Sequence, residues 1–244
     1  MPDLLLLSNS TSPGMGFLEH ARRPITELIP RPGSHLLFVP FAGFDHDTYT
    51  RVMTDALAPL SIRVTGAHQV GDPAGALGDC DAVFVGGGNS FRLLRALEDT
   101  GLKAAIPARV RAGLPYLGSS AGTNMACPTL RTTNDMPIVQ PASFDALGLI
   151  PFQVNPHYLD ADPASTHQGE TRAQRIAEFL DCNAVPVLGL REGSWLRVGG
   201  ARASLGGTTA ARLFTRDVPG GTELGPGTDV SELLRTVPRY DAPR

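Results

Sequence analysis

The stretch LPYLGSSAGTNM (residues 114–125) joins a short apolar run to a segment of helical pattern. Its centre, Gly118 to Gly122, matches the pattern G-x-S-x-G. After a buried strand and before a helix, this pattern is typical of a nucleophile elbow, a sharp turn that exposes a serine hydroxyl at the carboxyl end of a sheet. Glycine makes the turn possible because it lacks Cβ. The stretch therefore predicts Ser120 as a nucleophile, with the amide of Ala121 facing a developing oxyanion.

Apolar runs of strand length alternate with segments of helical period along the chain. We expect helices near 16–29, 48–57, 90–100, 106–112, 121–125 and 171–180, and strands near 4–7, 35–41, 62–67, 82–85, 114–117 and 185–190. This alternation predicts an α/β fold with a mostly parallel sheet and helices on both faces. The stretch 195–214 predicts hairpin strands at a C-terminal edge, whereas 127–165 is irregular. Without repeats or long linkers, residues 1–244 are expected to form a single domain.

Composition excludes several classes of protein. The 244 residues are 42% hydrophobic and 18% charged, so the chain is neither disordered nor a membrane protein. A net charge of −3 does not favour nucleic-acid binding. Three scattered cysteines are too few for a disulfide framework or a CxxC metal site and fit a reducing compartment. We expect a cytoplasmic protein without a membrane partner, because the run 4–7 lacks the features of an export signal.

A second glycine-rich turn, Gly86-Gly87-Gly88-Asn89, follows the expected strand 82–85 and opens a helix. Glycine lets backbone amides approach a ligand closely, and the helix dipole favours negative charge there. A dinucleotide site is excluded because Phe91 stands where a third glycine is needed, and no lysine follows for a P-loop. The turn instead predicts the partner of the elbow, with the N–H of Gly88 as the other oxyanion donor.

A serine nucleophile needs a base and an acid that orients it. Of six histidines, His157 in NPHY (155–158) follows a strand-like run in an irregular region, where catalytic groups cluster. Two carboxylates are candidates for the acid. Glu192 follows the expected strand 185–190 and is favoured by that position. Asp135 lies between the serine and the histidine in the chain and could instead bind substrate.

Five segments together resemble the peptidase E family of serine peptidases, the α-aspartyl dipeptidases: VGGGNSFRLL (85–94), LGSSAGTNMA (117–126), RTTNDMPIV (131–139), QVNPHYLD (153–160) and GETRAQRI (169–176). The resemblance implies a fold similar to that of class I glutamine amidotransferases, with serine in place of their elbow cysteine. It also implies Ser120 as nucleophile and His157 as base, with Glu192 or Asp135 as the acid. No cofactor and no metal are implied.

The resemblance further implies small peptides with an unblocked N-terminal aspartate as substrates, cleaved through an acyl-enzyme. Such a substrate needs a cation for its side chain. Arg172 and Arg175 lie i, i+3 on one expected helix face, and arginine offers a planar fork for a carboxylate. Asn89 and Glu170 are candidates for further polar contacts. We expect a monomer or a homodimer.

Two alternatives remain open from the sequence. One is a cyanophycinase-like peptidase on the same scaffold, acting on a β-linked aspartyl-arginine polymer. The other is a non-catalytic, amidotransferase-like binding domain, although such a module has no need for serine, histidine and acid together.

Overall fold

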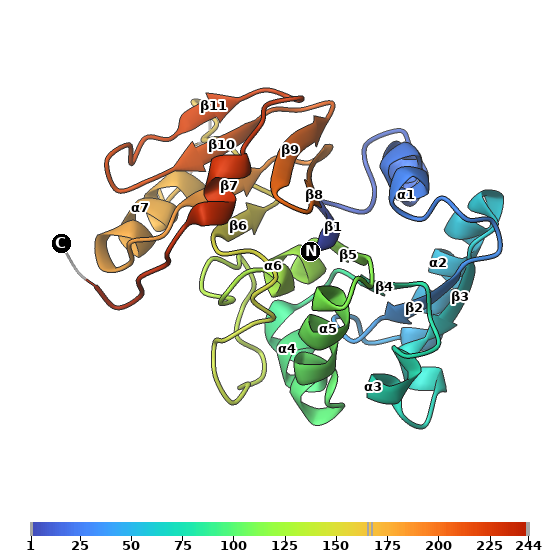
Figure 1. Cartoon of the computed structure of the whole chain (residues 1–244). Coiled ribbons are helices and arrows are strands. Elements are labelled where there is room, and N and C mark those ends of the chain that lie inside the picture. The colour runs from blue at the N-terminus through green and yellow to red at the C-terminus, as the bar shows by residue number, and fades with distance from the viewer. Residues whose placement is uncertain (1, 165, 167, 243–244) are drawn as a thin grey trace.

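A seven-stranded sheet is the larger of two sheets in the computed structural model, which describes residues 2–164, 166 and 168–242 (Figure 1). Its strand order is β3-β2-β4-β5-β1-β8-β9. The first five strands are parallel, and the hairpin β8–β9 adds antiparallel to β1. The bounds are β1 (Asp3–Leu7), β2 (His35–Val39), β3 (Arg63–Gly66), β4 (Ala82–Val85), β5 (Tyr116–Ser119), β8 (Ser194–Gly199) and β9 (Arg202–Gly207).

Helices cover both faces of this sheet, which confirms the predicted α/β fold. Alternate side chains of each strand enter different cores, and Leu4 to Leu7 are fully buried because both faces are covered. Helices α1 and α2 pack on one face, and α4, α5 and α6 on the other. The bounds are α1 (Arg22–Leu28), α2 (His46–Leu57), α3 (Pro73–Ala76), α4 (Ser90–Asp99), α5 (Leu102–Arg111) and α6 (Ala121–Ala126), with 3-10 turns at Glu19–Ala21, Ala58–Leu60, Ala67–Gln69 and Ser231–Arg235.

Local predictions were accurate where the sequence signal was strong. The strand 82–85 and the helix from Ser90, capped by Asn89, lie where the pattern placed them. The expected helix 16–29 is shorter and begins with a 3-10 turn, and the helix near 106–112 begins earlier, at Leu102.

A second, four-stranded sheet has the order β11-β10-β7-β6 and was not predicted as a separate layer. Strands β6 and β7 are parallel, whereas β10 pairs antiparallel with both β7 and β11. Helix α7 packs on it through Ile176 and Leu180 against Val187 and Phe214. The bounds are β6 (Gln153–Pro156), α7 (Arg172–Cys182), β7 (Val187–Leu190), β10 (Ala211–Phe214) and β11 (Thr222–Leu224). Phe214 therefore ends a strand of this sheet rather than of the β8–β9 hairpin.

The two sheets meet where β1 ends. Ser8, the residue after β1, is fully buried and its hydroxyl donates to the carbonyl of Leu190 at the end of β7. The amide of Ser8 donates to the carbonyl of Ser194. The carboxyl ends of β1, β5, β6 and β7 are thereby brought to one region of the molecule. Within the described part of the chain, no helix combines the length and the apolar character needed to cross a bilayer.

Candidate active site

Ser120 occupies the sharp turn between β5 and α6. Its φ of 53° and ψ of −112° are rarely adopted by a residue with a side chain. The turn is held at both ends of the residue. The amide of Ser120 donates to the carbonyl of Leu7, and its own carbonyl accepts from the amides of Thr123 and Asn124. The Thr123 hydroxyl also donates to the Leu7 carbonyl, at 2.7 Å. These hydrogen bonds hold Ser120 in a backbone conformation that a residue with a side chain would not otherwise adopt.

Two backbone amides beside Ser120 are free to bind an anion. The Ser120 side chain does not cap α6. Among the described residues, neither the amide of Ala121 nor that of Gly88 has a hydrogen-bond partner. The glycine-rich turn lies against the serine, because a Cβ on Gly87 would stand 3.1 Å from the Cβ of Ser120. At Gly88, φ is +133° and a Cβ would be 2.4 Å from the carbonyl oxygen of Ala42, so only glycine is accommodated.

His157 follows β6 and lies between Ser120 and Glu192. Its Nε2 is 2.9 Å from the Oγ of Ser120, and its Nδ1 is 2.8 Å from the Oε1 of Glu192. The backbone at His157 also has a φ of 53°, and its amide donates to the Ser8 hydroxyl. The side chains of His157 and Glu192 are 40% and 53% exposed, so this chain of hydrogen bonds lies at the surface. A serine hydroxyl, an imidazole and a carboxylate in this order can perform nucleophilic catalysis.

The turn that carries Glu192 is held from two sides. The amide of Gly193 donates to the Oδ1 of Asn9, and the hydroxyl of Thr209 donates to the carbonyl of Glu192. Sequence reasoning missed both Asn9 and Ser8. The polar residues directly after the first strand were the available signal, since residues at the carboxyl ends of adjacent parallel strands share one edge of the sheet.

Arg191 links the segment after His157 to the segment before Glu192. Its guanidinium is bonded to the carboxylates of Asp160 and Glu223, at 2.7 and 2.9 Å, and lies over the ring of Tyr158. The hydrogen bond from Arg191 lowers the pKa of Asp160. Tyr158 and Asp160 closely follow His157 in the chain, so Arg191 ties both halves of the hydrogen-bond chain together.

Asp135 does not contact His157. Its Oδ2 accepts hydrogen bonds from the amide of Ser90, the hydroxyl of Ser90 and the hydroxyl of Thr133, at 2.7, 2.6 and 3.1 Å. The alternative in which Asp135 orients the imidazole is therefore not supported by this geometry. One oxygen of the carboxylate, Oδ2, is committed to the first turn of α4, where the helix dipole and the amide of Ser90 favour it. Glu192 takes the position beside the imidazole.

Asn89 is likewise committed to the backbone. Its Oδ1 accepts from the amides of Phe91 and Arg92, and its Nδ2 donates to the carbonyl of Met136. Both acceptor positions of the amide oxygen are therefore used, and Asn89 does not line the pocket around Ser120, so the expected contact between Asn89 and a substrate stays a prediction. Asn89 instead joins the glycine-rich turn to the segment that carries Asp135.

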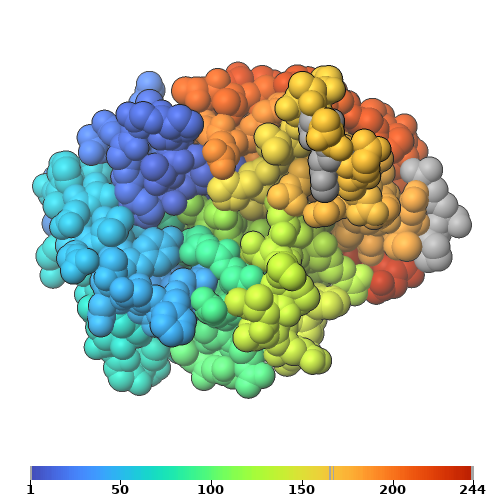
Figure 2. All heavy atoms as spheres, turned by 180° about the vertical axis from the view of Figure 1, so that it is seen from behind, coloured from blue at the N-terminus to red at the C-terminus, as the bar shows by residue number. Residues whose placement is uncertain are grey.

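A pocket of about 200 Å³ contains the hydrogen-bonded serine and histidine. The residues that line it are Ser120, Asn124, Thr133, Asn134, Asp135, Pro156, His157 and Arg172. Figure 2 shows the segments around residues 135–145 and 158–164 on the same face of the molecule. The pocket therefore brings a nucleophile, a base, a carboxylate and a guanidinium into one small volume.

Arg172 is the cation of this pocket. It makes no ion pair with any described residue. Burial lowers its pKa, the nearby positive charge of Arg175 acts in the same direction, and the negative charge of Asp135 in the same pocket opposes both. Arg175 itself is half-exposed, and its Nε is 3.7 Å from the Oε2 of Glu170. It lines two neighbouring hollows, which Arg172 lines too, but not the pocket around Ser120. Of the four predicted substrate contacts, the structure thus brings only Arg172 to the nucleophile.

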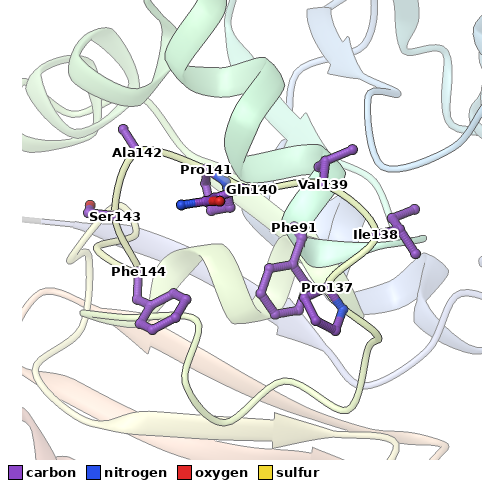
Figure 3. A pocket seen from close by; sticks show the side chains of 9 residues that line it. All are labelled: Phe91, Pro137, Ile138, Val139, Gln140, Pro141, Ala142, Ser143 and Phe144. Atoms are coloured by element: carbon purple, nitrogen blue, oxygen red, sulfur yellow. The ribbon is translucent and has the colours of Figure 1, made fainter.

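A larger hollow of about 580 Å³ is lined by Phe91 and the loop 137–144 (Figure 3). Its lining is mainly apolar and contains no acid, base or cation. It can offer contact area but no catalysis. Among the described residues, no three or more His, Cys, Asp or Glu side chains are grouped to hold a metal ion.

Comparison with known proteins gives a consistent result. Residues 4–206 match the family model of peptidase family S51. The chain is 62% identical to peptidase E of Streptomyces coelicolor over 98% of both chains. It is 50% identical to the "Probable alpha-aspartyl dipeptidase" of Drosophila melanogaster, covering 96% of this chain and 98% of that one. A crystal structure of a peptidase from an acI-B1 actinobacterium shares the fold, with a TM-score of 0.67 at 17% identity, covering 94% of this chain and 96% of that chain.

Proposed function

Because the chain belongs to peptidase family S51 and is a serine-type peptidase, we propose that it is an α-aspartyl dipeptidase. It hydrolyses dipeptides, and some short peptides, that carry an unblocked N-terminal aspartate. One observation carries the proposal: a single pocket of about 200 Å³ holds both the Ser120–His157 pair and the guanidinium of Arg172, which forms no ion pair within 4.0 Å with any described residue. A cation without a partner among the described residues, beside a nucleophile, favours a substrate that brings its own carboxylate.

In the proposed mechanism, Ser120 Oγ attacks the carbonyl carbon of the N-terminal residue, at the peptide bond that joins it to the second residue. His157 Nε2 accepts the hydroxyl proton, while Nδ1–H donates to Glu192 and keeps the imidazole in the productive tautomer. The amides of Gly88 and Ala121 stabilise the oxyanion. The C–N bond then breaks as His157 gives the proton to the leaving amine. Water, deprotonated by His157, hydrolyses the acyl-enzyme and releases aspartate.

Recognition of the N-terminal aspartate needs two charges of opposite sign. Arg172 binds the side-chain carboxylate in a bidentate manner. Arg175, one turn further along α7, adds positive potential but is partly neutralised by Glu170. Asp135 lines the same pocket, and its second oxygen has no hydrogen-bond partner among the described residues, so in this proposal it accepts the α-ammonium group. The small volume of the pocket supports a substrate with a single residue before the scissile bond.

The test is hydrolysis of Asp-Leu by the wild-type protein and two variants. Ser120→Ala should lose at least about 10⁴-fold in kcat without a change in melting temperature, because only the nucleophile is removed. Arg172→Met should lose about 10- to 100-fold in kcat/KM for Asp-Leu, since hydrogen bonds to charged groups contribute about 1.5–3 kcal/mol. Arg175→Met is the matched control and should lose much less, because its guanidinium lies outside the pocket.

Two further substrates separate this proposal from its alternatives. Asn-Leu, which lacks the side-chain charge, should be a poor substrate for the wild type, and the Arg172→Met variant should discriminate less between the two. A β-linked Asp-Arg dipeptide tests the cyanophycinase-like alternative. Faster cleavage of that substrate than of Asp-Leu, or turnover retained by Ser120→Ala, would contradict the proposal.

A further inference from the structure

Tyr49 reaches from α2 to the glycine-rich turn. Its hydroxyl oxygen accepts a hydrogen bond from the amide of Gly87, at 2.9 Å. The ring is set edge-on against Phe38, with centroids 4.9 Å apart, and against Phe17, with centroids 6.2 Å apart. These two contacts fix the plane of the ring, and the ring fixes the place of the hydroxyl. The mechanism proposed above does not use Tyr49.

Three glycines in succession cannot define their own conformation. Without Cβ atoms, their backbone has access to far more φ/ψ space than other residues do. The turn is therefore defined by its hydrogen bonds. The amide of Gly86 donates to Val39, that of Gly87 to Tyr49, and that of Asn89 to Ala42. Of these three acceptors, Tyr49 is the only side chain.

The amide of Gly88 is the one N–H of this turn that has no partner among the described residues. It belongs to the peptide group between Gly87 and Gly88. The preceding peptide group is fixed by Tyr49 and the following one by Ala42, so the free N–H is held from both sides. The Gly87 backbone lies against Ser120, since a Cβ added at Gly87 would be 3.1 Å from the serine Cβ. A shift of the Gly87 peptide would therefore be transmitted directly to the place where an oxyanion forms.

We propose that Tyr49 is a positioning residue of the oxyanion site: it accepts the Gly87 N–H and thereby aims the Gly88 N–H at the oxygen that becomes negative. This inference rests on the proposed acyl-transfer mechanism. Burial raises the pKa of Tyr49, so the hydroxyl stays neutral and its lone pair stays available to the amide. The contribution is made in the transition state, because a ground-state carbonyl oxygen gains less from the donor than an oxyanion does.

The test is Tyr49→Phe, which keeps the ring packed against Phe38 and Phe17 and removes only the acceptor. Loss of an oxyanion donor costs about 10²- to 10³-fold, so a misaimed donor should lower kcat for Asp-Leu by about 10- to 100-fold. KM should change by less than about threefold, because ground-state binding does not use the donor. Tyr240→Phe is the matched control: it removes the hydroxyl of a ring in the C-terminal segment that lies against the guanidinium of Arg131, and it should leave both constants unchanged.

A second measurement does not depend on the peptide substrate. The rate at which a small fluorophosphonate modifies Ser120 also requires a donor for the phosphoryl oxygen, whatever the enzyme cleaves. It should fall by about tenfold in Tyr49→Phe and stay unchanged in Tyr240→Phe. If wild-type protein reacts with the fluorophosphonate but not with Asp-Leu, the proposed substrate is wrong and the role of Tyr49 is still measured. Equal modification rates, or equal kcat values, in wild type and Tyr49→Phe would overturn the inference.

Discussion

Ser120 and His157 share an unusual backbone state. Both have a φ of 53°, which costs energy for a residue with a side chain and persists only where the surroundings over-determine it. The surroundings here are two consecutive residues. Leu7 accepts the amide of Ser120 through its carbonyl, and Ser8 accepts the amide of His157 through its hydroxyl. The end of one buried strand thus sets the positions of both the nucleophile and the base.

Glu192 should contribute to the rate of the chemical step, measured by kcat, and have little effect on substrate binding, measured by KM. Its Oε1 is 2.8 Å from His157 Nδ1, so Glu192→Gln replaces the carboxylate that stabilises the imidazolium with a neutral amide. We expect kcat for Asp-Leu to fall by about 10²- to 10⁴-fold with little change in KM, as for a comparable change in other serine enzymes. Steady-state kinetics at pH 7.5 would measure both constants.

Asp135→Asn is the matched experiment on the other carboxylate. The asparagine oxygen can still accept from the Ser90 amide, so the first turn of α4 is retained, whereas the charge that would bind the α-ammonium is lost. We expect KM for Asp-Leu to rise more than kcat falls. A fall in kcat equal to that of Glu192→Gln, with KM unchanged, would show that Asp135 belongs to the relay.

In the strand–turn–helix element β5–α6, the backbone of the helix packs directly against the backbone of the neighbouring strands. A Cβ on Gly118 would stand 2.6 Å from the carbonyl oxygen of Gly122, and a Cβ on Gly122 would stand 1.9 Å from that of Val85. The hydroxyl of Tyr116 also donates to the Gly122 carbonyl. The first turn of the helix is therefore pressed onto β4 and β5, and this contact directs the free amides of α6 toward Ser120.

Gly122→Ala should therefore destabilise the fold. In a helix, alanine is ordinarily favoured over glycine by about 1 kcal/mol, so any loss reflects the clash with Val85. Overpacking typically costs about 1–3 kcal/mol, and here the obstacle is backbone, which yields less than a side chain. Urea denaturation would measure the free energy of unfolding. Gly71→Ala, where an added Cβ would have nothing within 4 Å, is the control; an equal effect at both sites would contradict this reasoning.

At the scale of the whole molecule, the sequence predicted those strands and helices whose formation depends on residues close together in the chain. The strand 82–85 and the helix near 90–100 carry strong local patterns, and these elements lie as expected. The second sheet could not be predicted, because the pairing of β7 with β10 joins distant segments whose patterns are equally compatible with a single sheet. The choice between Glu192 and Asp135 as the acid beside His157 stayed open for the same reason. It depends on where Ser8 and Asn9, at the end of β1, lie in the folded molecule, and no local sequence pattern contains that information.

His20 lies at a junction between the N-terminal segment and the C-terminal hairpin. Its ring is packed near that of Trp195 in β8, with centroids 6.5 Å apart. Trp195 in turn pairs with Leu7 at the end of β1. Burial lowers the pKa of His20, and neither of its ring nitrogens has a hydrogen-bond partner among the described residues. Protonation of this imidazole would therefore place a charge between two parts of the molecule that meet next to the active site.

This arrangement predicts that the molecule loses stability in mild acid. An unfolded histidine takes up a proton as the pH falls through about 6.5, whereas folded His20, with its lowered pKa, does not. The unfolded state then binds more protons than the folded state, so the free energy of unfolding decreases as the pH is lowered. Below about pH 4 the lowered pKa of Asp160 acts in the same direction, because its stabilising charge is lost as the pH falls through the folded-state pKa.

Urea denaturation at pH 7.5 and 5.5 should show the loss of stability that is due to His20 in the wild type. The variant His20→Gln should reduce the difference between the two pH values, and His46→Gln is the control. A wild-type protein that is more stable at pH 5.5, or a His20→Gln variant with the same difference as the wild type, would contradict the assignment.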